Sequence, residues 1–485
     1  MFTQKRLLAL LWGAFLIIDG LTFCGHKSRQ IYISSVYTIH SKNYICLVNI
    51  PTKYNKKLLF ISNPKFHYYL IVKFRTFSIA TYVMLNRKYI LSCSLLLCCF
   101  LQTMQAQTNI RKVQFDFFGD TIKLAIEIPL SSQSGIGTTE QSVNTCYNSI
   151  KATNYQPLIQ SLLAYRQQYK LDDWLYYQLI RNTVQQISPK LENYERYTVF
   201  KWFLLIQSGY ATTLKIGNGQ LLFYVQTDEQ IFNLPFYMRY GKQYVCLNYH
   251  DFEPVNFDIN KFTEVDIINP QAGKAFTYKV TQLPDFNAVD YVEKDIQFNY
   301  YQDKYYFKVK LNPHIKRIFA NYPVVDYASY FNIPLSKGTY QSLIPLLKKE
   351  IKGMNINNGV DFLMRFTRYS FLFESDTKIY GEEKRLSPEQ TLLFDQSDCE
   401  DRAGLFFFLV KEIYNLPMIV LSFPTHVTIA VKFDKPIGKP ILYNGIAYSV
   451  CEPTPQKEDL NMGILLPELL KASYEVVYSY MPFKK

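Results

Sequence analysis

Acidic residues are almost absent from the first 106 residues of this 485-residue chain. That segment holds 13 of the 53 Lys and Arg residues but a single acid, Asp19. The rest of the chain contains 40 basic and 39 acidic residues, so the net charge of +13 comes almost wholly from the N-terminal segment. A nucleic-acid-binding protein concentrates positive charge on its folded body. The charge distribution therefore argues against nucleic acid as a partner.

Metal-ligand patterns and phosphate-binding loops are also lacking after residue 106. The four cysteines there, Cys146, Cys246, Cys399 and Cys451, form no CxxC pair, and the three histidines are scattered. Neither a glycine-rich phosphate loop nor an EF-hand pattern occurs. We therefore expect no metal and no organic cofactor. In an exported protein Cys146 could form a disulfide with Cys246, but the spacing does not establish one.

Residues 84–106 read as a signal peptide. Arg87 and Lys88 form a basic start, residues 90–101 are apolar, and Ala106 supplies the small residue of a cleavage site. The apolar run is too short to span a bilayer comfortably. We therefore expect export, with the protein in the periplasm or outside a bacterial cell and any membrane contact made only through this leader.

Residues 1–83 fit this interpretation poorly, because a signal peptide that begins at position 84 would have no use. We interpret them as an upstream extension or leader that precedes the true start at Met84. A second apolar run at 7–18 leaves a membrane anchor followed by an irregular linker as the alternative.

After residue 106 the sequence contains an internal repeat, which is typical of a repeated architecture. Four segments of the first copy match four of the second in the same order: 113–130 with 296–313, 154–163 with 339–348, 170–187 with 355–372, and 195–210 with 399–414. The first pair alternates about turns at Gly119-Asp120 and Gln302-Asp303, which predicts hairpins. The other pairs have helical spacing.

We therefore predict an α+β fold of two halves, residues 107–292 and 293–485. Each half should contain a β-hairpin, a helical segment, a central helix and an antiparallel sheet. Residues 251–286 carry short strand patterns and form either the β-rich end of the first half or a bridge to the second. No long Gly/Ser linker separates the halves, so we expect them to pack together.

The segment 397–410 carries the candidate chemistry. It places Cys399 in the first turn of an apolar helix, capped by Ser397 or Asp398. Free N–H groups and the helix dipole favour a thiolate there. The neighbouring acids Glu400 and Asp401 oppose that effect by like-charge repulsion.

Two further residues follow on predicted strands. His426 opens the alternating strand 426–433, and Glu452 ends the outgoing strand of a hairpin that turns at Asn444-Gly445. A thiol on a helix, an imidazole at a strand start and a carboxylate at a strand end form a nucleophile, a base and a group that orients the base. Cys399, His426 and Glu452 are the predicted catalytic residues.

The pattern DCEDRA with its apolar helix, then HVTIAV, then YSVCEPT resembles the transglutaminase-like branch of the papain-like cysteine enzymes over residues 340–455. The resemblance implies a helix-plus-strands fold and acyl transfer or amide hydrolysis, with the family's Cys, His and Asp at Cys399, His426 and Glu452. Glu452 departs from the usual Asp, and Ser397 stands where members often have Gly.

In the first half the corresponding positions carry Glu195, Leu222 and Asn248, so that half reads as a degenerate copy. The predicted function is an exported cysteine hydrolase or peptidase that cleaves an amide or ester bond through an acyl-enzyme on Cys399. Its substrate would be a peptide, a protein or a component of the cell envelope. The alternative is a non-catalytic binding or scaffold protein of the envelope. The 40 tyrosines leave carbohydrate binding as a third possibility.

Overall fold

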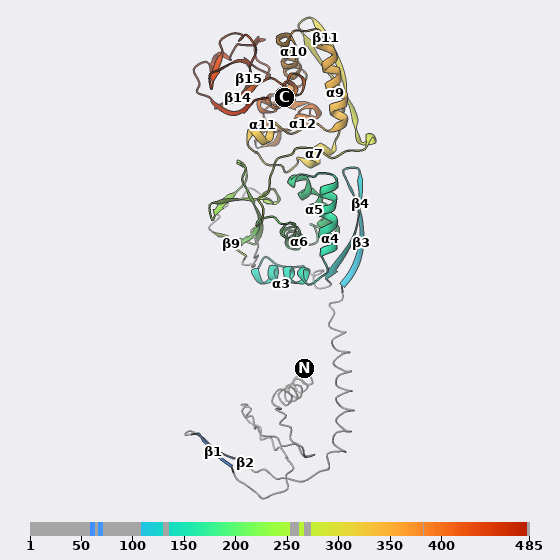
Figure 1. Cartoon of the computed structure of the whole chain (residues 1–485), viewed down its shortest axis with the longest axis vertical. Coiled ribbons are helices and arrows are strands. Elements are labelled where there is room, and N and C mark those ends of the chain that lie inside the picture. The colour runs from blue at the N-terminus through green and yellow to red at the C-terminus, as the bar shows by residue number, and fades with distance from the viewer. Residues whose placement is uncertain are drawn as a thin grey trace, which may run out of the picture. The chain divides into compact units, whose positions relative to one another are not determined.

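The computed structural model describes residues 59–63, 66–70, 108–129, 135–252, 261–265, 273–381 and 383–482 (Figure 1). The chain divides into two compact units, Met1–Gln105 and Ala106–Lys485. In the first unit β1 (Leu59–Asn63) pairs antiparallel with β2 (Phe66–Leu70). The predicted signal peptide lies outside the described residues, as does most of segment 1–83. Within the described residues, no helix has the length and apolar character needed to cross a membrane.

The second unit begins with the elements of the first half. They are β3 (Thr108–Phe117), β4 (Asp120–Pro129), α3 (Glu140–Lys151), α4 (Gln156–Gln168), α5 (Asp173–Ile187), α6 (Tyr194–Gln207), β5 (Thr212–Gly217), β6 (Gln220–Thr227), β7 (Phe236–Arg239), β8 (Lys242–Cys246) and β9 (Thr263–Glu264). The hairpin β3–β4 is separate from a five-stranded sheet of order β7-β8-β6-β5-β9.

The second half repeats this plan with additional short elements. It contains β10 (Val292–Tyr300), β11 (Asp303–Leu311), α7 (His314–Ile318), α8 (Tyr327–Tyr330), α9 (Lys337–Glu350), α10 (Ile356–Tyr369), β12 (Leu372–Phe373), α11 (Asp376–Tyr380), α12 (Pro388–Leu393), β13 (Gln396–Ser397), α13 (Cys399–Tyr414), β14 (Met418–Phe423), β15 (His426–Val431), β16 (Ile441–Tyr443), β17 (Ile446–Cys451) and β18 (Glu475–Tyr480). Its hairpin is β10–β11, and its sheet has the order β16-β17-β15-β14-β18.

The two sheets have the same strand order when their strands are matched along the chain. In each half the main helices lie between the hairpin on one side and the sheet on the other (Figure 1). The predicted mixed α+β fold with antiparallel sheets is confirmed at this level. The sequence placed both hairpin turns one residue late, because Phe117 pairs with Asp120 and Tyr300 with Asp303.

The segment predicted as a β-rich end or bridge contains little regular structure where it is described. Its only sheet pairing in the part the structure describes is the two-residue β9, together with an isolated bridge between Tyr210 and Lys274. Residues 275–287 run in an irregular extended course. Backbone N–H groups of this segment form hydrogen bonds without being part of a sheet. Phe276 N–H donates to the Gln226 carbonyl at 2.7 Å, and Thr277 N–H donates to the Asp173 side chain at 3.0 Å.

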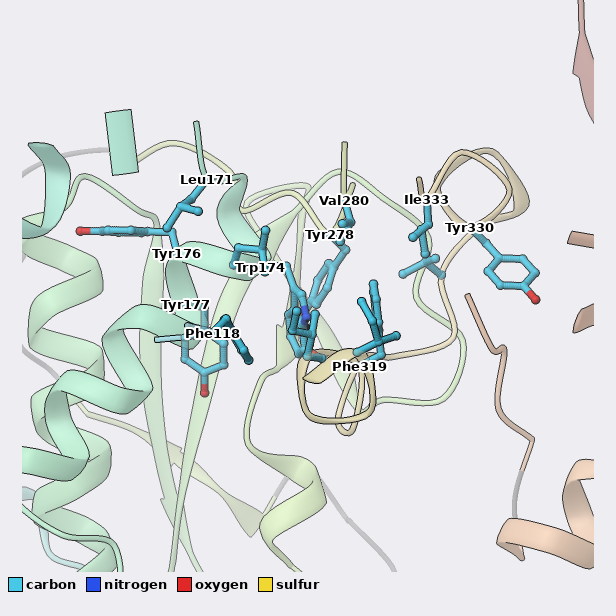
Figure 2. Packing of buried hydrophobic residues seen from close by; sticks show 14 of the residues in the cluster. Phe118, Leu171, Trp174, Tyr176, Tyr177, Tyr278, Val280, Phe319, Tyr330 and Ile333 are labelled. Carbon is cyan, nitrogen blue, oxygen red and sulfur yellow. Dashed lines mark hydrogen bonds between the residues drawn. The ribbon is translucent and has the colours of Figure 1, made fainter. Parts of the chain in front are cut away.

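The halves pack together through aromatic residues, as expected from the missing linker. Trp174 of α5 is 1% exposed and its indole N–H donates to the Ile318 carbonyl at 2.9 Å. Its ring lies 5.2 Å from that of Tyr322, whose hydroxyl donates to the Tyr278 carbonyl. Figure 2 shows Trp174 and Tyr278 of the first half next to Phe319 of the second. One continuous apolar core therefore joins the halves.

Cys146 and Cys246 are both free and buried, so the structure contains no disulfide between them. Cys146 packs in the large core, whereas Cys246 lies in a separate cluster on the other face of the first sheet.

Glu389 of α12 connects this helix to the end of the hairpin β10–β11 and to the start of α9. It precedes Cys399 by ten residues in the sequence. Its carboxylate is fully buried and accepts hydrogen bonds from Asn312 N–H (3.3 Å), Ser336 N–H (2.6 Å), the Ser336 hydroxyl (2.8 Å) and the Thr339 hydroxyl (2.7 Å). Buried donors that lose their acceptor destabilise a fold strongly.

We predict that Glu389→Ala lowers the free energy of unfolding by about 3–5 kcal/mol, because several buried donors lose their acceptor. Glu389→Gln should cost less, since the amide oxygen still accepts. Chemical denaturation measures both. The control is Glu293→Ala, at an exposed ion pair, with an expected change below about 0.5 kcal/mol. Equal losses in the Glu389→Ala and Glu293→Ala variants would contradict the role given to Glu389.

Candidate functional site

Cys399 is the first residue of α13, as predicted. Asp398 caps the helix, and its side chain accepts the Asp401 N–H at 3.2 Å. The middle of α13 is fully buried because its residues are apolar on all sides, and it packs against α10, α12 and β15. A rigid core helix therefore fixes the position of the Cys399 backbone.

The structure brings His426 and Glu452 together. The turn at Pro424-Thr425 starts β15 at His426, and Ile429 pairs with Cys451, so the end of β17 reaches the start of β15. His426 Nε2 lies 2.8 Å from Glu452 Oε2. The other carboxylate oxygen accepts the Thr454 N–H at 2.8 Å, which holds the carboxylate in place.

The pKa of His426 is raised above its ordinary value. Burial opposes the charged imidazolium, but the hydrogen bond and the charge of Glu452 outweigh it. Glu452 is 2% exposed, so little solvent screens the pair. With Nε2 bound to the carboxylate, Nδ1 is the ring nitrogen left for exchange of a proton with a nucleophile.

The thiol of Cys399 lies beside this pair and is bonded to another group. Its Sγ donates to Glu400 Oε2 at 2.7 Å. The backbone N–H of Val427, the residue after His426, also forms a hydrogen bond with the Cys399 sulfur. Within the described part of the chain the thiol makes no hydrogen bond to His426. The thiol must therefore leave Glu400 before the imidazole takes its proton.

The charge balance at Cys399 favours the neutral thiol. Burial raises the thiol pKa first, and the carboxylates of Glu400 and Asp398 raise it further, whereas the Val427 N–H lowers it. The thiol pKa is thus raised by burial first and by acids second, and the acids are Glu400, as expected, and Asp398 in place of Asp401. In this arrangement the nucleophile depends on a base, because it does not ionise by itself.

Asp376, Glu383 and Asp398 form a carboxylate cluster next to the thiol, with ligand atoms within 4.8 Å of one another. Burial, followed by neighbouring acids, raises the pKa of Asp398 to about 8, and burial raises that of Asp376 to about 7. These carboxylates could share protons or hold a cation. Among the described residues, this cluster has ligand atoms close enough together for a metal ion, and no spacing of residues in the sequence had indicated it.

Arg402, in the first turn of α13, has a fully buried side chain, although a charged residue at a helix start ordinarily lies on the surface. It donates to the carbonyls of Thr367 (3.2 Å), Arg368 (2.8 Å) and Phe371 (3.0 Å) at the end of α10. A long guanidinium side chain can satisfy helix-end carbonyls inside a core, which no periodicity rule foresees. Arg402 therefore fastens α13 to α10.

Arg368 continues this connection to the carboxylate. It is 1% exposed, and its Nε and Nη2 donate to the Glu452 carbonyl at 3.1 and 2.5 Å. Its Nη1 donates to Asp459 at 2.7 Å. Sequence reasoning missed this residue. Its signal was a pair of arginines, Arg365 and Arg368, three residues apart in an apolar helical run.

The first half lacks this chemistry, although the matching of its residues needs correction. The helix caps Asn193 and Asp398 accept the N–H three residues on, so Tyr194, and not Glu195, corresponds to Cys399. The two-residue turns that precede β6 and β15 make Gln220, and not Leu222, the equivalent of His426. Loops of different length shift the match by one or two residues.

Asn248 keeps its correspondence to Glu452 and bonds to the residue that replaces the cysteine. Its Nδ2 donates to the Tyr194 hydroxyl at 2.6 Å, and that hydroxyl donates to Asp251 at 2.9 Å. A phenol, an amide and a carboxylate thus fill the position.

The Cys246 thiol donates to the Asn248 side chain at 3.5 Å, and the His250 imidazole lies 3.2 Å from Asp251, but neither occupies the place of Cys399 or His426. Among the described residues of this half, the helix start therefore carries a phenol where the second half carries a thiol.

Comparison of the chain with protein-family models, with curated proteins and with solved structures found no match.

We predict that Arg368→Lys lowers the pKa of His426 toward its ordinary value and slows alkylation of Cys399 about tenfold. Lysine cannot reproduce the two bonds to the Glu452 carbonyl, so the carboxylate loses its fixed position. NMR titration of His426 and alkylation rates measure the two effects.

Arg365→Lys is the matched control. Arg365 is as buried, in the same helix, and binds Asp361 and Asp459 but not Glu452. It should destabilise the fold without moving the His426 pKa. If the His426 pKa shifted equally in both variants, Arg368 would have only a structural role and no specific effect on the His426–Glu452 pair.

The raised pKa of His426 also predicts how stability varies with pH. A group whose folded pKa is raised stabilises the fold below its unfolded pKa, about 6.5 for histidine, and loses that effect as pH rises through the folded value. The stability difference between wild type and His426→Gln should therefore shrink from pH 5.5 to pH 8, a range of about 2.5 units around that value. Denaturation of both proteins at several pH values measures this difference in the free energy of unfolding. A difference that grows as pH rises would contradict a raised folded pKa for His426.

Proposed function

We propose that the second half is a transglutaminase-like cysteine hydrolase that cleaves an amide or ester bond through an acyl-enzyme on Cys399. The observation that carries the proposal is the 2.8 Å bond between His426 and Glu452, formed beside a thiol at the start of a core helix. A nucleophile, a base and a group that orients the base are the parts this chemistry requires. The order and placement of these three residues also support the family resemblance.

The reaction would begin when the thiol leaves Glu400 and gives its proton to Nδ1 of His426. Sγ attacks the carbonyl carbon, a C–S bond forms, and the carbonyl oxygen becomes an oxyanion. Collapse of this intermediate breaks the bond to the amine or alcohol, which takes the proton from His426. Water, deprotonated by His426, then attacks the thioester and releases the acid and the thiol.

Two features would support the charged states along this path. The Glu452 side chain remains bonded to Nε2 and stabilises the imidazolium formed when the thiol is deprotonated. The N–H of Cys399 lies in the first turn of α13, where backbone donors have no acceptor inside the helix and can bind an oxyanion. The acids Glu400 and Asp398 work against the thiolate, so the substrate-free enzyme would rest as the thiol.

The substrate would be a peptide, a protein or a cell-envelope component that an exported protein meets. Export to the periplasm or cell exterior rests on the signal-peptide pattern at 84–106, with membrane contact only through that leader. We favour hydrolysis over cross-linking because water is always available to an exported protein.

One observation favours a second candidate, a non-catalytic binding or scaffold protein of the envelope. The thiol is bonded to Glu400 and not to His426. If the thiol never leaves Glu400, the protein keeps its fold but cannot carry out the reaction. The first half, which has no cysteine at this position, shows that the fold does not require the nucleophile.

Alkylation of the full chain with iodoacetamide separates the two candidates. Cys399 should react at neutral pH far faster than Cys451, which is fully buried, and His426→Ala should slow it by about 10²–10⁴-fold, the contribution of a general base. His314→Ala is the control, since that ring packs on Phe118 and Phe286 away from the thiol. Slow, His426-independent alkylation of Cys399 would favour the binding protein.

A further inference from the structure

The second half has a longer connection ahead of the helix α13 than the first half has ahead of α6. In the first half residues 188–193 join α5 to α6, whereas residues 370–398 join α10 to α13 and include α11 and α12. The longer connection brings two acids, Asp376 and Glu383, to the start of α13. There they meet the helix cap Asp398, and ligand atoms of the three carboxylates lie within 4.8 Å of one another. The longer connection is therefore what assembles this carboxylate cluster.

Two buried carboxylate oxygens at this cluster have no hydrogen-bond partner among the described residues. One is Oδ1 of Asp376, a residue that is 2% exposed and whose other oxygen accepts the Lys384 N–H at 2.9 Å. The second is Oδ2 of Asp401, which is fully buried. Among the charges around Asp401, those of Asp398 and Asp376 act on it most strongly. Because a buried carboxylate oxygen without a partner is costly, the cluster calls for a further partner.

The arginines near the cluster are bonded to other groups. Arg385 donates from Nη1 to the Val325 carbonyl at 2.5 Å, and Arg402 donates to three backbone carbonyls at the end of α10. The charges of these arginines and of Lys384 act on the acids, but within the described residues neither guanidinium bonds to an oxygen of the cluster. Five acids gather here: Asp376, Glu383, Asp398, Glu400 and Asp401. The basic side chains therefore offset the negative charge only in part.

We propose that Asp376, Glu383 and Asp398 bind a divalent cation of the calcium type. Such a cation takes about six to eight oxygen ligands at about 2.3–2.6 Å, so ligand oxygens on opposite sides of it stand about 5 Å apart. The spread of the three carboxylates fits that distance. A donor set made of carboxylates also favours calcium or magnesium over zinc. Glu383 is exposed, so water can fill the remaining positions on its side.

The two buried aspartates favour calcium over magnesium. Asp398 Oδ1 accepts the Asp401 N–H at 3.2 Å, and Asp376 Oδ2 accepts the Lys384 N–H at 2.9 Å. These bonds fix both side chains, so they cannot rearrange into the regular octahedron with distances of about 2.0–2.1 Å that magnesium demands. Calcium accepts an irregular arrangement. The bound ion would fasten the connection 370–398 to the start of α13, a role that requires no catalysis and goes beyond the proposed function.

Calorimetric titration of the full chain with CaCl₂, after removal of bound metal with EDTA, tests the proposal. We expect one Ca²⁺ per chain with a Kd below about 1 mM, and Mg²⁺ should bind at least about tenfold more weakly. Glu383→Gln should raise the Kd for Ca²⁺ at least about tenfold, because affinity depends on the number of charged ligands. Glu383 is exposed, so this variant keeps its fold. Asp376→Asn should abolish binding.

Glu374→Gln is the matched control. It removes a carboxylate from the same connection, but Glu374 pairs with Lys378 and does not belong to the cluster. Its Kd for Ca²⁺ should equal that of wild type. Thermal denaturation gives a second readout, since an ion that binds only the folded state raises Tm. Ca²⁺ should raise the Tm of wild type and of Glu374→Gln, and it should leave the Tm of Asp376→Asn unchanged.

Absence of saturable Ca²⁺ binding to wild type up to about 10 mM would overturn the site and leave the buried acids to share protons. Binding that Glu383→Gln and Asp376→Asn leave unchanged would overturn it as well, because the ion would then lie elsewhere. Mg²⁺ binding as tight as that of Ca²⁺ would overturn the assignment to calcium. Calorimetry needs no substrate, so these outcomes do not depend on whether Cys399 is a nucleophile.

Discussion

The hydrogen bond between His426 and Glu452 is the interaction on which the site depends. It joins the start of β15 to the end of β17, so it exists only if the sheet has the register that the structure shows. It raises the pKa of a histidine that burial alone would lower. Two buried arginines stabilise the elements that carry this pair. Arg402 connects α13, the helix that begins with Cys399, to α10, and Arg368 donates to the backbone carbonyl of Glu452.

Buried charge of this kind is costly and contributes little net stability, so its arrangement needs a reason other than folding. Around Cys399 the acids outnumber the bases, and the thiol is kept neutral and bonded to Glu400. A neutral resting thiol resists oxidation, because the thiolate is the reactive form. In the proposed reaction a neutral thiol cannot act until the imidazole takes its proton, so the resting state and the mechanism are linked.

Much of this site could be predicted from the sequence, because its parts follow local rules. Capping placed Cys399 in the first turn of a helix, and alternation with the Asn444-Gly445 turn placed His426 and Glu452 at strand ends. The rest depends on contacts that no local pattern encodes. The thiol donates to the side chain of the next residue, Glu400, and Arg402 is buried where three backbone carbonyls accept its hydrogen bonds. Unequal loops likewise displaced the matching of the degenerate copy.

The most direct test of the central claim is a pre-steady-state reaction of the full chain with a p-nitrophenyl ester, followed by mass spectrometry of the Cys399 peptide. If Cys399, His426 and Glu452 act together, p-nitrophenol is released in a burst of one equivalent per chain, and the acyl group is found on Cys399. Glu452→Ala should slow the burst without changing its amplitude. Absence of a burst, or acyl groups spread over lysines with Cys399 unmodified, would contradict the account.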